Sequence, residues 1–240
     1  YWPAFLLAAK IPLPKKVYGH GWILSGDEKM SKSKGNILDP IEIINQYGLD
    51  PLRYYLIKEV SFGNDGNISQ ERLEDCINSD LANNFGNLCQ RVTAFAIKNC
   101  DSKIPSKIKL EIDDLKILDK FKSNLDLIRD KIDNQDINFY ISFIINSLFE
   151  ANKYFNDQEP WKKKDNMIRL NSIVYTSLEI VRKISFMLYP IIPESSLNAL
   201  KIFDIKENEI VFSTLNNHEY LKGNNDINKI DILFLSLIHI

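Results

Sequence analysis

The sequence predicts a short α/β segment followed by a mainly α-helical bundle, and three observations lead to this fold class. In residues 1–36, a helix-like start and a proline-bounded turn precede an apolar run, VYGHGWIL (17–24). Beyond residue 70, apolar residues recur at spacings of three and four, which is typical of amphipathic helices. The hydrophobic content of 45% over 240 residues is ordinary for a globular protein with a sizeable core.

Residues 1–36 are expected to contain a helix, a buried strand and a loop. Phe5 to Ala9 favour the helix, and the apolar run 17–24 favours the strand. The segment GDEKMSKSKGN (26–36) follows, with its lysines and serines bracketed by glycines. Because it follows a strand of an α/β unit, we expect this loop at the carboxyl edge of a sheet, where nucleotides bind.

Residues 37–77 are expected to hold two short helices and a turn. Two Asp-Pro pairs (39–40 and 50–51) each place a capping carboxylate before a proline suited to the first helical position. Gly48 stands where the first of these helices would end. The stretch VSFGNDGNISQE (60–71) predicts a Gly/Asn/Asp turn after a short strand.

Residues 78–234 are expected to form a bundle of four or five amphipathic helices with short connections. The apolar spacing predicts helices across 81–95, 115–132, 137–155 and 166–189. Residues 235–240 (LSLIHI) are an apolar tail after a polar stretch, and we expect them to be foreign to the gene.

Charge and cysteine content narrow the function classes. A net charge of −2 gives no global positive field, so any polyanion site must be a local patch. The three cysteines show no CxxC spacing, so we expect neither a disulfide framework nor a zinc site, and no metal site of any kind. With no signal peptide and no apolar run long enough to span a bilayer, a cytoplasmic location is expected.

Two interpretations of the lysine-rich loop compete. Turns rich in Lys and Ser are common on solvated surfaces, and composition alone favours that interpretation. The alternative is a phosphate clamp, because ammonium groups, serine hydroxyls and loop amides all donate to phosphate oxygens. The string KMSKS (29–33) shifts the balance, since a specified five-residue match arises by chance with a probability on the order of 10⁻⁴.

KMSKS and its surroundings, HGWI before it and KGNILDPIEIINQYGLDPLRYYL after it, resemble the class I aminoacyl-tRNA synthetases. The stretches YWPAFLLAA, FGNDGNIS and INSDLANNFGNLCQR are similar to the methionyl-tRNA synthetases within that class. The resemblance extends to about residue 234. It implies that residues 1–36 end a Rossmann-type catalytic domain, 37–77 form a stem-contact linker and 78–234 form an anticodon-binding domain.

The resemblance implies an ATP-dependent ligase that activates methionine and transfers it to tRNA(Met), with ATP bound as its Mg²⁺ complex. Lys29 and Lys32 would neutralise charge on the β- and γ-phosphates, while Ser31 and Ser33 would contribute hydroxyls or loop geometry. Phosphoryl chemistry depends mainly on such charge stabilisation and positioning. His20 would lie beside the adenine, and a core histidine is the alternative interpretation.

A second site is predicted in the helical part. Asn87 and Arg91 lie four residues apart, so they share one helix face, and both side chains can pair with base edges. Trp161, after Pro160, offers a surface on which an unstacked base can stack. A helix-surface pair and a packing tryptophan are the alternatives. The resemblance assigns all four residues to the CAU anticodon of tRNA(Met).

The HIGH signature of class I synthetases is absent, so we expect a fragment of a longer protein that by itself cannot form the adenylate. Trp2 would lie near the methionine pocket, although a core aromatic is the better supported interpretation. Two alternatives stay open. One is the same region of another class I synthetase, for leucine, isoleucine, valine or cysteine. The other is a non-catalytic helical tRNA-binding module. The sequence does not indicate the oligomeric state.

Overall fold

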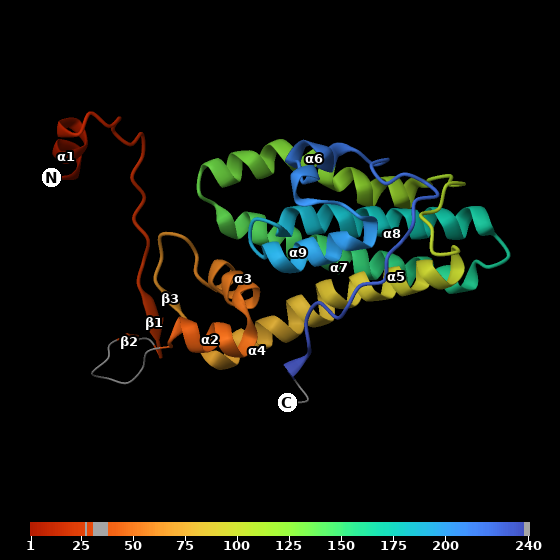
Figure 1. Cartoon of the computed structure of the whole chain (residues 1–240), viewed down its shortest axis with the longest axis horizontal. Coiled ribbons are helices and arrows are strands. Elements are labelled where there is room, and N and C mark those ends of the chain that lie inside the picture. Colours follow the sequence, from red (N-terminus) through yellow and green to blue (C-terminus); the bar gives the residue numbers. More distant parts are fainter. Residues whose placement is uncertain (27, 31–37, 238–240) are drawn as a thin grey trace.

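The computed structural model describes residues 1–26, 28–30 and 38–237. An extended N-terminal segment and a small sheet stand at one end of a long helical part (Figure 1). This agrees with the predicted order of a short mixed segment followed by helices. None of the helices in the described part of the chain is both long and apolar enough to cross a membrane.

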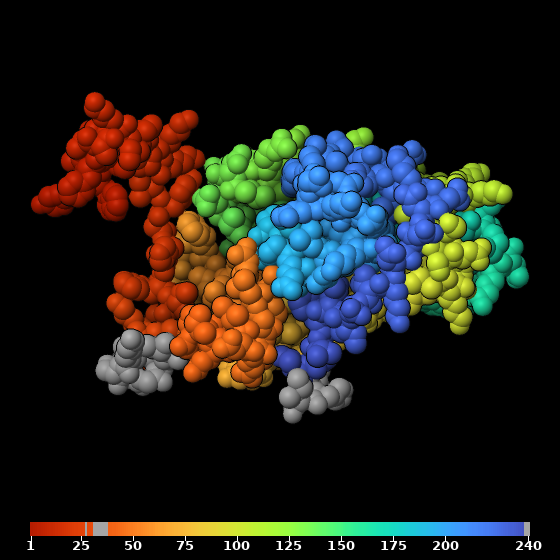
Figure 2. Space-filling view, in the orientation of Figure 1, coloured from red at the N-terminus to blue at the C-terminus, as the bar shows by residue number. Residues whose placement is uncertain are grey.

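The N-terminal segment begins with helix α1 (Trp2–Ala8), which confirms most of the predicted helical start. None of its residues is buried, and Figure 2 shows the segment standing off from the helical part. The predicted buried strand across 17–24 is wrong for most of its length. Only its last two residues belong to β1 (Ile23–Ser25), and Val17 is 86% exposed. Extended backbone needs hydrogen-bond partners to form a strand, and a neighbouring strand supplies them only from Trp22 onward.

A three-stranded sheet in the order β2-β1-β3 anchors the end of this segment. Strand β2 (Glu28–Lys29) runs antiparallel to β1, and β3 (Gly66–Asn67) runs parallel to it. The N–H of Gly66 donates to the carbonyl of Trp22 over 2.8 Å, and the N–H of Trp22 donates to the carboxylate of Asp65 over 2.6 Å. The predicted Gly/Asn/Asp turn therefore precedes its strand instead of following it.

Helices α2 (Pro40–Tyr47) and α3 (Leu49–Glu59) lie between strands β2 and β3 in the chain. Asp39 caps α2 as predicted, because its Oδ1 accepts the N–H of Ile41 over 2.8 Å. The chain turns between the two helices at Gly48, whose φ of 92° lies in the region that favours glycine. The predicted end of the first helix is confirmed.

The predicted cap at Asp50 is wrong, because α3 begins one residue earlier and Asp50 lies inside its first turn. Its buried carboxylate instead accepts the N–H of Ser195 over 2.7 Å, in the first turn of α9 (Pro193–Leu200). Arg53, one turn further along α3, donates to the backbone carbonyls at 190–191 over 2.9 and 2.7 Å. Helix α3 is thereby fastened to the start of α9.

One continuous helical segment follows. It consists of α4 (Gln70–Cys76), a π-helical stretch η2 (Ile77–Gly86) and α5 (Asn87–Asn99). It begins where Ser69 accepts the N–H of Arg72 over 3.2 Å. This segment contains the helix predicted across 81–95. A π-helix this long is rare, and such stretches are frequent at functional sites.

The remaining helices form the bundle and confirm the mainly helical prediction: α6 (Ile112–Asp133), α7 (Ile137–Gln158), η3 (Pro160–Lys162), α8 (Met167–Leu188) and α9. Helix α8 is buried along nearly its whole length and forms the centre of the bundle. Helices α5, α6, α7 and α9 surround it, as Figure 1 shows. The hydrophobic core therefore lies around α8.

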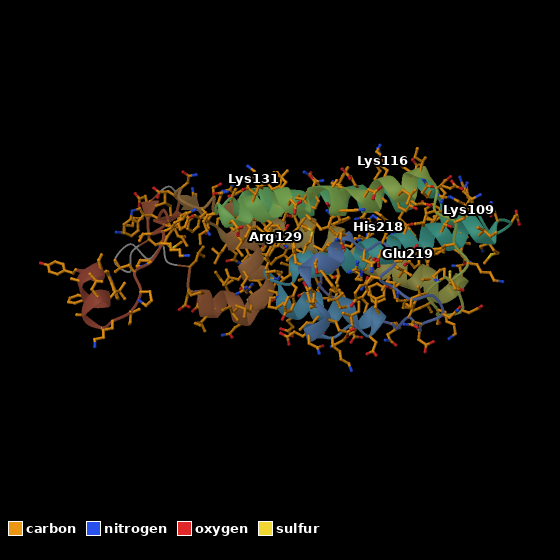
Figure 3. All side chains as sticks on the ribbon, turned by 90° about the horizontal axis from the view of Figure 1, so that it is seen from above. Lys109, Lys116, Arg129, Lys131, His218 and Glu219 are labelled. Carbon is orange, nitrogen blue, oxygen red and sulfur yellow. The ribbon has the colours of Figure 1, made fainter. Side chains whose placement is uncertain are left out.

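The C-terminal stretch packs back onto the bundle through three short 3₁₀ turns, η4 (Lys201–Phe203), η5 (Glu207–Glu209) and η6 (Phe212–Asn216). His218 pairs with Asp119 of α6 at 2.8 Å, and Figure 3 shows His218 beside that helix. Further on, the ring of Phe234 lies 6.5 Å from that of Phe85, and the N–H of Leu237 donates to Asn78 over 2.6 Å. Of the predicted foreign tail, residues 238–240 lie outside the described residues.

Candidate functional site

The KMSKS string is described only at its first two residues, Lys29 and Met30. Ser31, Lys32 and Ser33 lie outside the described residues. Lys29 belongs to β2, directly opposite Leu24 of β1. Its ammonium nitrogen lies 3.7 Å from the centre of the Trp22 ring, a close cation–π contact. The sheet therefore holds the start of this lysine-rich segment against an aromatic face.

His20 is exposed and does not lie in the core. Its Nδ1 lies 2.9 Å from the carbonyl oxygen of Gly21. The imidazole lines a mainly apolar cavity of about 250 Å³, together with residues of α3 and of the 60–64 turn. At Gly21, a Cβ would lie 2.1 Å from the carbonyl oxygen of Asn64, so only glycine allows this close approach. Trp2 is 76% exposed and is not a core aromatic.

Two of the residues predicted in the helical part, Arg91 and Trp161, lie at one surface formed by α5, α7 and η3. Arg91 of α5 donates from Nη2 to Oδ1 of Asn156 over 2.6 Å. Its guanidinium carbon lies 5.6 Å from the centre of the Phe155 ring. The Trp161 ring lies 6.2 Å from the same Phe155 ring, in an edge-to-face arrangement. We call these four residues the Arg–Trp cluster.

The turn from α7 into η3 positions Trp161. Glu159 adopts the left-handed conformation with φ of 45°, which ends α7 and redirects the chain. Pro160 is buried and begins η3, and Trp161 follows with 41% of its surface exposed. Lys162 binds back to Glu159 with an N–O distance of 2.7 Å. Pro160 therefore acts as the buried support, while the indole stays accessible.

Asn87 lies at the beginning of α5, one turn before Arg91, and its side chain is exposed. Its side-chain amide makes no hydrogen bond within the described part of the chain. The structure thus brings Arg91 and Trp161 against the same phenylalanine and leaves Asn87 open on the adjoining turn. Cluster residues Phe155 and Asn156 were not predicted. Phe155 belongs to the apolar pattern of its helix, and nothing in the sequence distinguishes Asn156.

The π-helical stretch before Asn87 is fixed by polar contacts. Asp80 binds Lys58 at 2.8 Å and accepts from the hydroxyl of Tyr54 over 3.1 Å. Burial acts to lower the pKa of Lys58, but the hydrogen bond to Asp80 and nearby negative charges outweigh it, so the pKa is raised. Nearer α5, Asn84 accepts from Asn152 of α7 over 2.7 Å. These contacts set the orientation in which α5 presents its first turns.

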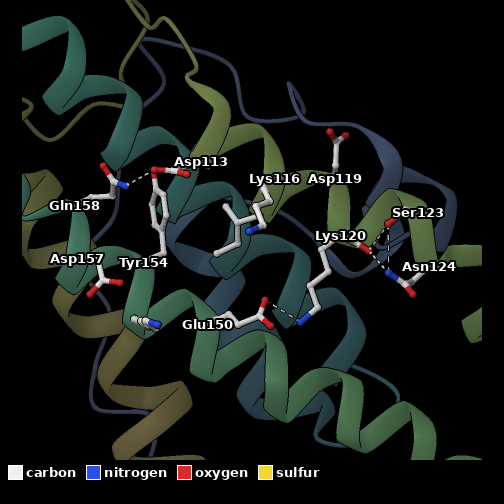
Figure 4. Close-up of a pocket in the computed structure, with 12 residues that line it drawn as sticks. Asp113, Lys116, Asp119, Lys120, Ser123, Asn124, Glu150, Tyr154, Asp157 and Gln158 are labelled. Atoms are coloured by element: carbon white, nitrogen blue, oxygen red, sulfur yellow. Dashed lines mark hydrogen bonds and ion pairs between the residues drawn. The ribbon is translucent and has the colours of Figure 1, made fainter.

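A separate hollow of about 700 Å³ lies between α6 and α7 (Figure 4). Its charges are mixed, and Lys120 pairs with Glu150 at 2.9 Å. The residues of the Arg–Trp cluster do not line it. Across the described residues, no group of three or more His, Cys, Asp or Glu side chains is placed to hold a metal ion. The hollow therefore shows no charge pattern that selects one ligand.

Comparisons with known proteins agree on one family. Residues 1–93 match the family model described as tRNA synthetases class I (M). The chain is 41% identical over 214 residues to the methionine–tRNA ligase of Brucella suis, which covers 89% of this chain and 42% of the relative. It is also 41% identical over 241 residues to that of Rickettsia felis, which covers 98% of this chain and 46% of the relative.

A solved structure gives the same result. Mycobacterium tuberculosis methionyl-tRNA synthetase in complex with methionyl-adenylate superimposes with a TM-score of 0.90 and 34% identity, covering 98% of this chain and 47% of that one. The chain thus spans less than half the length of the relatives that it matches. It belongs to the methionyl-tRNA synthetase family of class I tRNA synthetases.

Proposed function

We propose that the chain carries the KMSKS and anticodon-binding portions of a cytosolic methionine–tRNA ligase. In this assignment, residues 1–36 end the catalytic domain, 37–77 form the stem-contact linker and 78–234 bind the anticodon of tRNA(Met). The juxtaposition of Arg91 and Trp161 over Phe155 carries the proposal. These two residues lie far apart in the sequence, yet they form one accessible surface suited to an unstacked base.

The Arg–Trp cluster has the chemistry that single-stranded RNA recognition requires. The exposed Trp161 ring gives a face on which a base of the CAU anticodon stacks. The N–H groups of Arg91 and the open amide of Asn87 pair with base edges, and Pro160 supports the tryptophan. Because the chain has a net charge of −2, binding of this RNA depends on such local contacts instead of a general attraction.

The activation half of the reaction is assigned to the N-terminal portion. A carboxylate oxygen of methionine attacks the α-phosphorus of ATP, and the bond to the bridging oxygen breaks, so that methionyl-adenylate forms and pyrophosphate leaves. Lys29 and Lys32 stabilise the charge on the departing phosphates, with Ser31 and Ser33 as further donors. His20, which lines an apolar cavity, lies beside the adenine. ATP enters this reaction as its Mg²⁺ complex.

A binding titration tests the anticodon assignment. The 240-residue chain is titrated with two tRNA transcripts at one fixed salt concentration, one carrying CAU and the other differing only in the anticodon. We expect a clear preference for CAU. Equal affinity for both transcripts, lost together as salt rises, would mean phosphate contacts alone and would contradict the assignment.

A further inference from the structure

Arg91 is held from two sides, although it lies at the surface of the bundle. Asn156 accepts one of its N–H groups over 2.6 Å, and the guanidinium lies 5.6 Å from the Phe155 ring centre. Its other N–H groups have no partner in the described part of the chain. A free arginine samples many rotamers and loses that freedom on binding, whereas a held one presents its planar fork in a fixed direction.

Apart from its bond to Arg91, the Asn156 side chain shows no structural role. Its side chain is exposed, so it fills no space in the core. Within the described residues, its only side-chain hydrogen bond is the one to Arg91. Asn152 gives the contrast one turn earlier in α7, because it donates to Asn84 over 2.7 Å and to the carbonyl of Leu148 over 3.1 Å. Two amides on one helix thus have different partners, and only Asn156 binds Arg91.

We propose that Asn156 is a positioning residue for anticodon reading, an inference that rests on the proposed function. Its Oδ1 takes one N–H of Arg91 and fixes the guanidinium against Phe155. The remaining N–H groups then stay open to the edge of a base beside the one stacked on Trp161. Asn156 therefore determines specificity through Arg91 and need not contact the RNA itself.

The test measures anticodon preference in variants of the 240-residue chain. Dissociation constants are determined for a CAU transcript and for three transcripts that each change one anticodon base. For Asn156→Ala we expect a three- to tenfold loss of CAU affinity and an equal fall in preference at one anticodon position. The salt dependence of binding should not change, because no phosphate contact is lost. Asn146→Ala, at an exposed position of α7 whose side chain makes no hydrogen bond in the described part of the chain, should keep the full preference.

Two further variants distinguish a positioning role of Asn156 from a general structural role. Asn156→Asp keeps an oxygen that accepts from Arg91, so it should retain the preference between anticodons even where its added charge weakens binding to every RNA. In an Arg91→Ala background, Asn156→Ala should have no further effect on preference. A preference that Asn156→Ala leaves intact, or that Asn156→Asp loses equally, would overturn this inference alone. An unmodified chain with no CAU preference would overturn the proposed function as well.

Discussion

Trp161 is the residue whose loss should weaken RNA binding most. Its ring is 41% exposed and rests edge-to-face on Phe155. Stacking of one base on an aromatic ring contributes roughly 1–3 kcal/mol. We therefore expect Trp161→Ala to weaken binding of the CAU transcript by about one to two powers of ten, measured by titration at fixed salt.

Trp2→Ala is the matched control for this prediction. Trp2 is also an exposed tryptophan, at 76%, but it lies in α1 on the segment that stands off from the helical part. Its removal should leave affinity for the CAU transcript unchanged. Trp161→Phe should recover part of the lost affinity, because a smaller ring still stacks. Equal losses in Trp2→Ala and Trp161→Ala would show a nonspecific effect and contradict the prediction.

Residues of the candidate site could be predicted only where the side chain itself can contact a base. Arg91, Asn87 and Trp161 have side chains of types that can pair or stack with bases, and the family resemblance singles them out. Phe155 looks like any core phenylalanine, although it lies under both Arg91 and Trp161. Asn156 is an ordinary polar residue near the end of a helix. Its bond to Arg91 depends on how α5 and α7 pack, which no local pattern encodes.

Three helices of the bundle are joined at one buried carboxylate. Asp114, in the first turn of α6, is fully buried. Arg169 of α8 donates to both of its oxygens, over 2.5 and 3.0 Å, and the hydroxyl of Tyr154 of α7 donates to it as well. Burial, reinforced by the bond to Asp114, raises the pKa of Tyr154, so this phenol stays protonated. The carboxylate fixes the mutual positions of α6, α7 and α8.

Asp114→Asn should destabilise the protein strongly. The change removes the buried charged partner of Arg169 and leaves it Glu111, a mostly exposed carboxylate 3.4 Å from Nε. Breaking such a buried pair costs about 3–5 kcal/mol. Urea unfolding should show a matching fall in the free energy of unfolding. Asp113→Asn, at the exposed neighbouring position, should change that free energy by less than about 0.5 kcal/mol. Similar losses in the two variants would contradict the importance of the buried link.

Asp50→Ala should loosen α9, although Asp50 belongs to α3. Its carboxylate caps the start of α9 by accepting the N–H of Ser195 over 2.7 Å, and losing a cap costs roughly 1 kcal/mol. Hydrogen exchange of the first amides of α9 should accelerate in this variant. Asp39→Ala removes a cap of the same kind from α2 alone, so the α9 amides should keep their protection. Unchanged exchange in Asp50→Ala would contradict the link.

The helices could be predicted from the sequence, but the hydrogen bonds that join one helix to another could not. The apolar spacing indicates the helices of the bundle because each buries one face. Asp50 shows where this reasoning fails. Its Asp-Pro pair fits a local cap, but the helix already begins at Leu49, and the carboxylate accepts an N–H that lies 145 positions further along the chain. The strand across 17–24 failed for a related reason, since strands depend on distant partners.

At the scale of the whole molecule, one buried lysine fastens the C-terminal stretch to the central helix. The ammonium of Lys183 on α8 donates to the carbonyls of Leu215 and Asn217, the latter over 2.8 Å. Burial lowers the pKa of Lys183 to about 7, while Glu179 raises it and Arg182 lowers it further. The segment that contains η6 therefore rests on a cation that titrates near neutral pH.

The stability of the molecule should rise as pH increases from about 7 to 8. In this range the unfolded chain still holds the Lys183 proton, with an ordinary pKa near 10.4, whereas the folded chain releases it. Stability rises wherever the unfolded state binds more protons, here by at most about 1.4 kcal/mol per pH unit. Urea unfolding at several pH values measures this slope. Lys183→Met should remove it, and Lys201→Met, at an exposed position, should keep it.

Above this range the thiols ionise in the unfolded chain, while burial in the folded chain raises the pKa of Cys76 to about 12. Stability should therefore fall again at higher pH. An equal slope in the chain with and without Lys183 would assign the dependence to other groups.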